Sequence, residues 1–330
     1  MLTRALLLSL AVSLANGVWA CELCAIYNAD SAASGSGKGF SFAVSEQYIP
    51  YGTVQLNGRQ LPPSILDQTF VNTSMTHFVP TWSFSKMFSV SLSVPVVHKE
   101  FKFLQLTGTG ILTESGQETG LGDISLIGRC RVFQAREGMA AITVNLLAGV
   151  KFPTGDAEKL NEEVELTREL DAIYGVGHQH SVSGVHLSDL ALGSGSYDGV
   201  FGLTVNSRWQ RLFCNAQFQY YLRTPGEAGY EFGNEWMISG GPGVYLFVHE
   251  AFTLSLQTLA TYDTSDTDTL LGRPNRNTGM TAIYLGPQLY LTLGERFSAN
   301  AGVDLPISID NNGLQNVPDY RIHAGVSFRF

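Results

Sequence analysis

The chain ends in Tyr320-Arg-Ile-His-Ala-Gly-Val-Ser-Phe-Arg-Phe330, a stretch in which apolar and polar side chains alternate. Successive side chains of a β-strand point to opposite faces, so this pattern gives one apolar and one polar face. The apolar face carries Tyr320, Ile322, Ala324, Val326, Phe328 and Phe330. A cation facing lipid at mid-depth costs roughly 2–4 kcal/mol, whereas a watery lumen imposes no such cost. The segment therefore predicts a strand with lipid on one side and water on the other.

The same period of two recurs along most of the chain, for example in residues 88–94, 252–256 and 297–305. A soluble β-sandwich gives the same alternation, so the connections between strands must decide between the two folds. We expect about twelve strands, near residues 39–50, 70–84, 88–98, 121–133, 139–153, 196–208, 212–223, 235–247, 251–262, 279–292, 296–308 and 319–330.

The predicted connections alternate between short and long. Short joins lie near residues 85–87, 135–138, 209–211, 248–250 and 294–296, and the long ones include 99–120, 154–195 and 263–278. Short turns at one end, long loops at the other and an even number of strands are typical of bacterial outer-membrane proteins. The sequence therefore predicts an all-β fold, a transmembrane antiparallel up-and-down β-barrel, with outer-membrane lipid around it.

Composition agrees with this fold class. Charged residues make up 15% of the chain, 35 residues are glycine, and the mean hydropathy is +0.06. This hydropathy is too low for a helical membrane protein, and no later segment has the roughly twenty apolar residues of a spanning helix. The net charge of −9 argues against nucleic acid as a partner, because a phosphate-binding surface needs clustered cations.

The N-terminus has the pattern of an export signal. Residues 1–20 carry one cation, Arg4, then a short apolar run, then small residues where a signal peptidase would cut. A membrane anchor is the competing interpretation, but the apolar run is only about ten residues long. We therefore expect a signal peptide over residues 1–20, a periplasmic segment with a cysteine pair over 21–38, and the barrel over 39–330.

Three segments resemble a known family of outer-membrane barrels. They are Gly120-Leu-Gly-Asp-Ile-Ser-Leu126, Val150-Lys-Phe-Pro-Thr-Gly-Asp156 and Leu192-Gly-Ser-Gly-Ser-Tyr-Asp198. In this order they resemble the outer-membrane β-barrel transporters named for the MetA pathway of phenol degradation. The resemblance implies a small channel, with hydrophobic or aromatic compounds among its solutes, and it carries over no binding residue.

Strand parity predicts which side chains face the lumen. The predicted lumen set is Asp123, Arg129, Arg131, Lys151, Arg208, Arg223, Asp304, Arg321, His323 and Arg329, together with the polar residues Thr204, Asn206, Asn215, Gln217 and Gln219. Several cations against few acids indicate a locally positive bore that favours anions. Equally, these side chains could pair across a narrow barrel and plug it. Cys130 and Cys214 have the opposite parity and are expected to face lipid without forming a disulfide.

Two further groups could bind a metal. Cys21 and Cys24 form a Cys-x-x-Cys pair, for which a disulfide, a soft metal or redox partner contact, and lipid attachment all remain open. In the loop 154–195, whose residues 162–171 have helical character, His178 and His180 lie on one side of an extended chain, with His186 nearby. A solvated loop is the competing interpretation of these histidines.

The sequence lacks the usual marks of a hydrolase, and the only remaining enzymatic alternative is a site assembled from scattered residues. We therefore expect an outer-membrane channel for passive passage of small solutes, not an enzyme, and without a cofactor unless metal binds at Cys21 and Cys24 or at the His178 loop. The alternative is a barrel partner of a periplasmic redox or metal protein, acting through Cys21 and Cys24. Conductance in planar bilayers discriminates the two.

Overall fold

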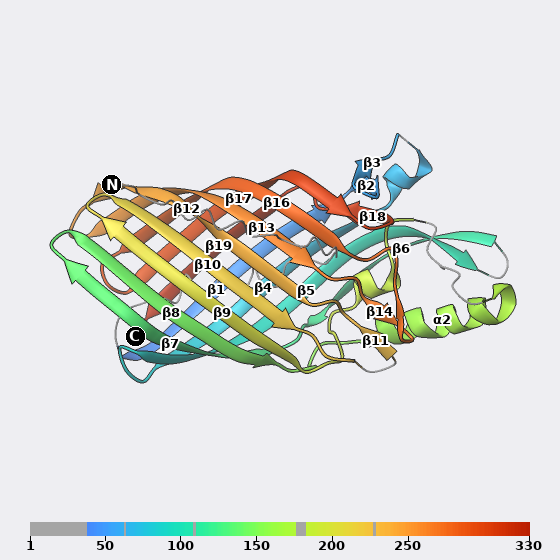
Figure 1. Cartoon of the computed structure of the whole chain (residues 1–330), viewed down its shortest axis with the longest axis horizontal. Helices are drawn as coiled ribbons and strands as arrows, with labels where there is room; N and C mark the ends of the chain where they lie inside the picture. The colour runs from blue at the N-terminus through green and yellow to red at the C-terminus, as the bar shows by residue number, and fades with distance from the viewer. Residues whose placement is uncertain (1–37, 63, 108–109, 176–182, 227–228) are drawn as a thin grey trace, which may run out of the picture.

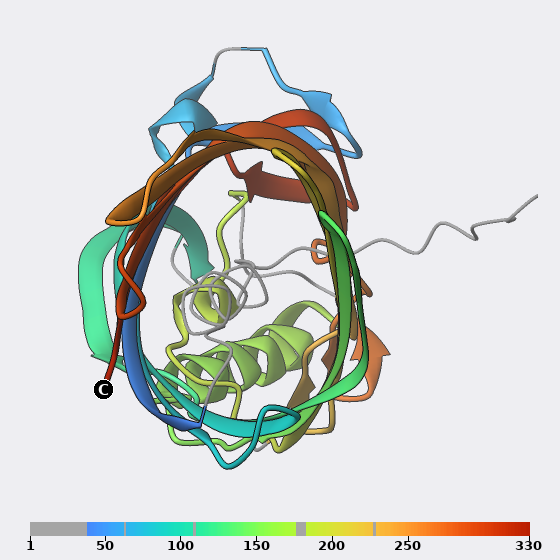
Figure 2. The same cartoon turned by 90° about the vertical axis from the view of Figure 1, so that its left-hand side faces the viewer.

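The computed structural model describes residues 38–330 apart from residues 63, 108–109, 176–182 and 227–228. Its main feature is one antiparallel sheet that closes on itself. β1 (Gly39–Tyr51) pairs with β19 (Arg321–Arg329) on one side and with β4 (Phe70–Ser83) on the other, so the two ends of the sheet meet. Figure 2 shows the closed ring. The predicted twelve-strand antiparallel barrel is confirmed.

Neighbours in the wall are neighbours in the chain, as in an up-and-down barrel. The remaining wall strands are β5 (Phe88–Thr107), β6 (Gly110–Leu121), β7 (Ser125–Glu137), β8 (Ala140–Lys151), β9 (Asp198–Trp209), β10 (Leu212–Leu222), β12 (Glu235–Val248), β13 (Phe252–Ser265), β16 (Met280–Leu293) and β17 (Phe297–Asn311). β6 and β7 pair with successive parts of β5 and so share one of the twelve positions in the wall. Because lipid offers no hydrogen bonds, this continuous pairing is what allows the backbone to cross the membrane.

One predicted loop is wrong. Residues 99–107 and 110–120 are not a loop, because β5 continues to Thr107 and pairs with β6 from Val96 to Thr107. The expected strand over 121–133 instead begins as β6, breaks at residues 122–124, and resumes as β7. At the break the amide of Gly122 donates to the carbonyl of Pro95, and a Cβ at Gly122 would lie 3.0 Å from both Pro95 and Val97. A larger residue at position 122 would require these neighbours to shift by a few tenths of an ångström, so the close approach favours glycine at the break.

The outer surface of the wall is apolar. Along β16, Ile283, Leu285, Leu289 and Leu293 are each at least 41% exposed, while Tyr284, Gly286 and Gln288 are buried. Near the short turns aromatic rings adjoin one another, as Trp82 does with Phe84. An apolar band flanked by aromatic residues is the exterior of an outer-membrane barrel.

The connections are segregated by end, as expected. The five short turns and the C-terminus lie at one end, and the long connections lie at the other (Figure 1). At the long-loop end two small sheets form, from β2 (Thr53–Leu56), β3 (Arg59–Gln60) and β18 (Leu314–Val317), and from β11 (Tyr230–Glu231), β14 (Thr269–Leu270) and β15 (Arg273–Pro274). The short helix η1 (Ile65–Gln68) joins β3 to β4.

The connection between β8 and β9 carries the helix α2 (Glu158–Tyr174) and the short helix η2 (Leu187–Leu190). The helical character predicted for residues 162–171 is therefore confirmed. In the described part of the chain, no helix has the length and apolar character needed to cross a membrane.

The segregation of the connections gives a test of orientation. Ile173 on α2 and Met139 in the turn after β7 are similarly exposed, at 62% and 69%. In a variant without native cysteines, Ile173→Cys should react on intact cells with a membrane-impermeant maleimide, because long loops face outward in this class. Met139→Cys should react only after the outer membrane is permeabilised. Equal labelling of the two on intact cells would contradict the orientation.

Candidate channel lumen

The connection between β8 and β9 folds into the long-loop end of the barrel. Seen along the barrel, α2 lies within the outline of the ring (Figure 2). Residues 183–196, here called the strap, are almost entirely buried: Ser183, Val185, Ser188 and Leu190 are 0% exposed. A surface loop would be exposed, so burial of this degree means that the strap lies inside the mouth of the barrel.

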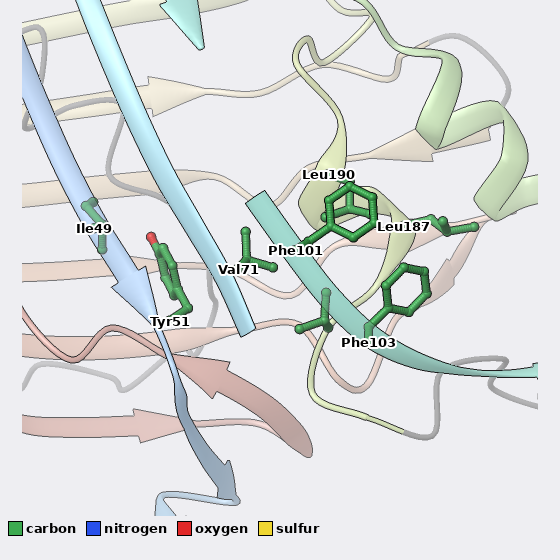
Figure 3. Packing of buried hydrophobic residues seen from close by; sticks show 8 residues of the cluster. Ile49, Tyr51, Val71, Phe101, Phe103, Leu187 and Leu190 are labelled. Carbon is green, nitrogen blue, oxygen red and sulfur yellow. The ribbon is translucent and has the colours of Figure 1, made fainter. Parts of the chain in front are cut away.

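One side of the strap is held by apolar packing. Leu187 and Leu190 contact the wall residues Val71, Phe101 and Phe103 in a buried cluster (Figure 3). The other members of this cluster are Ile49, Tyr51 and Val185. Full burial of one such side chain contributes about 1.5–3 kcal/mol, so the cluster is a substantial part of the strap's stability.

Lys99 of β5 adds a polar contact on the same side. Its Nζ donates to the carbonyl oxygens of Asp189, at 2.8 Å, and Ala191, at 2.6 Å. These two carbonyls belong to η2 and the residue after it, and a buried ammonium group needs such acceptors. Lys99 therefore ties the middle of the strap to the wall.

The far side of the strap meets the three segments that carry the family resemblance. Asp123 Oδ2 accepts hydrogen bonds from the backbone N–H of Ser194, at 2.8 Å, and from its hydroxyl, at 2.6 Å. The amides of Leu192 and Gly193 donate to the carbonyl of Asp156, and a Cβ at Gly193 would lie 2.5 Å from the backbone of Gly155. The glycines of these segments permit backbone-to-backbone contact between the strap and the start of its own loop.

A buried network of charges completes this contact. Lys151 Nζ lies 3.0 Å from Asp123 Oδ2 and 2.9 Å from Asp198 Oδ2. Arg223 continues the network, with Nη1 2.9 Å from Asp198 Oδ2 and Nη2 3.2 Å from Glu235 Oε2. We call these five residues the charge network. Each charge has a partner within hydrogen-bond distance, which is the condition for keeping ions in a buried site.

A second polar group lies further along the wall. The Arg321 guanidinium stacks on the ring of Tyr284, 3.4 Å from its centroid, and lies 3.3 Å from Asp263 Oδ2. His323 Nδ1 lies 3.8 Å from Asp304 Oδ2. These side chains pair with one another across the wall strands from β13 to β19 rather than projecting as free charges.

The short-turn half of the lumen contains a cavity of about 360 Å³. It is lined by Arg129, Ala141, Thr143, Asn145, Thr204, Asn206, Ser207, Arg208, Phe213, Asn215, Ala216, Gln217, Tyr245, Thr253, Ser255, Tyr290 and Thr292. A second recess, of about 1070 Å³, lies among α2 and the long loops and shares no lining residue with the first. The strap and the charge network lie between these two groups of residues along the barrel.

The residues of the predicted lumen set fall into three groups by where the structure places them. Asp123, Lys151, Arg223, Asp304, Arg321 and His323 are all buried, Arg129 and Arg208 line the cavity, and Arg131 and Arg329 are half-buried. However, the lumen is not uniformly positive, because Asp198, Glu235 and Asp263 are also buried there and pair with the cations. Asp198 and Glu235 are the first residues of β9 and β12, and Asp263 lies within β13. The alternation along these strands could have shown that the three acids face the lumen.

The structure describes some of the predicted cysteines and histidines and not others. Cys130 is half-buried, Cys214 is exposed, and both are free thiols, as expected for outward positions. His186 is 3% exposed within the strap, so it is not on a solvated loop. Cys21, Cys24, His178 and His180 lie outside the described residues, as does the proposed signal peptide, so these sites stay predictions. Within the residues that are described, no group of three or more potential ligands could hold a metal ion.

The charge network predicts a large effect of losing one cation. Lys151→Met would leave Asp123 and Asp198 facing each other, and removing one partner of a buried ion pair costs about 3–5 kcal/mol. The free energy of unfolding should fall by this amount in urea titrations in lipid vesicles. As a control, Arg273→Gln breaks the exposed ion pair with Asp171, in which Arg273 is 50% exposed, and should cost about 0–1 kcal/mol. If both variants lowered the free energy of unfolding equally, Lys151 would not belong to a buried ion network.

The strap should also respond to pH. Burial raises the pKa of Asp189 from 3.8 to about 7, against the opposing effects of the His186 N–H and Lys99. Between these two values the docked strap retains a proton that the undocked strap releases, so docking weakens as pH rises from about 4 to about 7. Strap amides should exchange hydrogen more readily at about pH 8 than at about pH 5, after correction for intrinsic exchange, and Asp189→Asn should remove the difference. Persistence of the difference in that variant would exclude Asp189 as its source.

Comparison with known proteins agrees on the fold. No family model matches the chain, and no curated protein does, so the resemblance to the MetA-pathway family stays a prediction. The COG4313 outer-membrane channel from Pseudomonas putida F1 aligns with a TM-score of 0.56 and 9% identity, over 89% of this chain and 96% of that one. Two other structures are too distant to argue from. The NalP autotransporter translocator domain from Neisseria meningitidis aligns with a TM-score of 0.43 and 11% identity, over 93% of this chain and 94% of that one. The CymD monoaromatic hydrocarbon channel aligns with a TM-score of 0.37 and 6% identity, over 89% of each chain. The closed wall, the apolar exterior and the shared fold make this chain a bacterial outer-membrane β-barrel.

Proposed function

We propose that this chain is a channel for the passive passage of small solutes across the outer membrane, with its short turns facing the periplasm. The observation that carries the proposal is the cavity of about 360 Å³ in the short-turn half of the lumen. Among its lining residues only Ala141, Phe213 and Ala216 lack a polar side-chain atom. A filled structural barrel has no need of such a polar chamber, whereas a solute pathway does.

In this proposal the strap controls the outer mouth. It is held by apolar packing on one side and by the charge network on the other, and Lys99 fixes its middle. Movement of the strap would connect the recess among the long loops with the cavity near the short turns. The channel is therefore a gated one, with a narrow resting state.

The lining of the lumen also bears on the solute. The family resemblance implies hydrophobic or aromatic compounds, yet amide, hydroxyl and guanidinium groups dominate this cavity. An apolar solute would remove these groups from water without offering hydrogen bonds, at a cost of about 1–3 kcal/mol for each group. Hydrogen-bonding solutes suit the cavity better, and the proposal favours them.

The proposal includes that the chain is not an enzyme and uses no cofactor. The charged groups that come together in the lumen, such as Lys151 with Asp123 and Asp198, are engaged in holding the strap and the wall. A catalytic pair would instead need to reach a substrate. The role of Cys21 and Cys24 in contact with a redox or metal protein stays an untested alternative.

Single-channel recording in planar bilayers tests this function. Lys99→Met removes both hydrogen bonds from Lys99 to the strap, and each bond from a charged donor contributes about 1.5–3 kcal/mol. Since about 1.4 kcal/mol is a factor of ten in an equilibrium, the open probability should rise at least about tenfold above that of the parent.

Lys102→Met is the matched control, because Lys102 belongs to the same strand but bonds to the exposed Gln68, outside the strap. Its recordings should match those of the parent. If neither the parent nor Lys99→Met conducted at any voltage, the channel proposal would fail.

A further inference from the structure

The cavity near the short turns has a chemical character of its own. Two of its lining residues, Arg129 and Arg208, are cations, and none is a carboxylate. The acids that pair with Lys151, Arg223 and Arg321 are Asp123, Asp198 and Asp263, and none of these acids lines the cavity. A chamber lined by cations and neutral polar groups attracts anions.

The cavity also offers hydrogen bonds that the protein does not use. Gln217 is 5% exposed and lines the cavity, yet neither its amide oxygen nor its amide nitrogen has a partner among the described residues. Its neighbour across the strand pair, Thr204, already accepts from Asn145 Nδ2 at 2.9 Å. A buried amide with both a donor and an acceptor to offer fits a ligand that can accept and donate at adjacent atoms, as hydroxyl groups do.

An aromatic platform forms one wall of the cavity. The Phe213 ring lies over Gly243, where a Cβ would come within 2.1 Å of it, and packs against Tyr245 with 5.0 Å between ring centroids. The Arg208 guanidinium lies 5.4 Å from the centroid of Tyr245. Position 243 must therefore be glycine for Phe213 to lie against the wall. The result is an apolar surface of two rings inclined at 48° to each other, next to a cation and among hydrogen-bonding groups.

We propose that this cavity is a binding site for a small polyhydroxylated carboxylate, the class of the sugar acids. The arginines would attract the carboxylate, Gln217 and its amide and hydroxyl neighbours would bond to the hydroxyls, and the Phe213–Tyr245 platform would pack against the C–H face of the sugar. The inference rests on the proposed function in that it names the solute of the channel. Binding itself requires no membrane and is tested without one.

Other ligands match only part of this lining. An aromatic carboxylate can pair with the arginines and pack against the Phe213–Tyr245 rings, but it offers no hydrogen bond to the amide of Gln217. A neutral sugar satisfies Gln217 and the platform but not the cations. A site whose buried polar groups are arranged for hydroxyls discriminates strongly against analogues that lack them.

The test is isothermal titration of the full chain, folded in detergent, with D-glucuronate, D-glucose and benzoate at low salt. D-Glucuronate should bind most tightly. The affinities for D-glucose and for benzoate should each be lower by a factor of at least about ten, since a charge-assisted hydrogen bond is worth at least that factor. Benzoate binding as tightly as D-glucuronate would overturn the assignment of the hydroxyl-binding groups. Equal affinity for D-glucose and D-glucuronate would overturn the role of the cations, and absence of binding of all three would overturn the site.

Variants locate the site. Arg208→Gln should weaken D-glucuronate by about tenfold while leaving D-glucose unchanged, because the loss is one of charge. Gln217→Leu keeps the size of the side chain and should weaken both sugars by about tenfold. Arg329→Gln is the control: Arg329 has inward parity at the same end of the barrel but does not line the cavity, so neither affinity should change. An equal effect of Arg329→Gln and Arg208→Gln would show general electrostatics instead of a site.

Heat-modifiable migration on gels should be the same for all variants, which excludes misfolding as the cause of weak binding. The outcome is separable from that of the bilayer recordings. Binding without conductance would leave the site in place and remove the channel, whereas conductance without binding would remove the site alone.

Discussion

The pairing of β1 with β19 is the constraint on which this structure depends. Without it the sheet would have two open edges in hydrocarbon, and each unpaired backbone group there costs several kcal/mol. Closure has a further consequence, because a closed sheet has an inside. Side chains of one parity face lipid and must be apolar, while those of the other parity face a space where polar and charged groups can be kept if they find partners.

The interior is organised by how those partners are distributed. In the long-loop half, acids and cations occur together, and Asp123, Lys151 and Asp198 pair while binding the strap. In the short-turn half, Arg129 and Arg208 occur among neutral groups, and a cavity remains. Both halves follow the same physical rule, since a buried charge must be paired or solvated. The long-loop half satisfies it with protein groups, whereas in the short-turn half the cavity leaves the exposed Arg208 open to solvent and solute.

Local periodicity was enough to predict the wall. The expected strand over 235–247 is β12, Glu235–Val248, and that over 212–223 is β10, Leu212–Leu222, because alternation and turn residues are local signals. Arg321 and Lys151, for which the same alternation predicts an inward position, are both buried. What could not be predicted depends on contacts between distant residues. The continuation of β5 beyond residue 98 requires its partner β6. The convergence of Asp123, Gly155 and Ser194 on one site requires the fold to bring the break after β6 together with both ends of the β8–β9 connection.

The anchoring of the strap has a consequence for the order of assembly. The carbonyl of Gly184 accepts from the backbone N–H of Asn316 on β18, just before the last wall strand. Gly184 also sits so close to Asn316 that a Cβ there would lie 2.4 Å from its backbone. β18 is itself held by pairing with β2, which follows the first wall strand. This part of the strap's anchoring therefore depends on segments from both ends of the chain, so the narrowing of the mouth is coupled to the completion of the barrel.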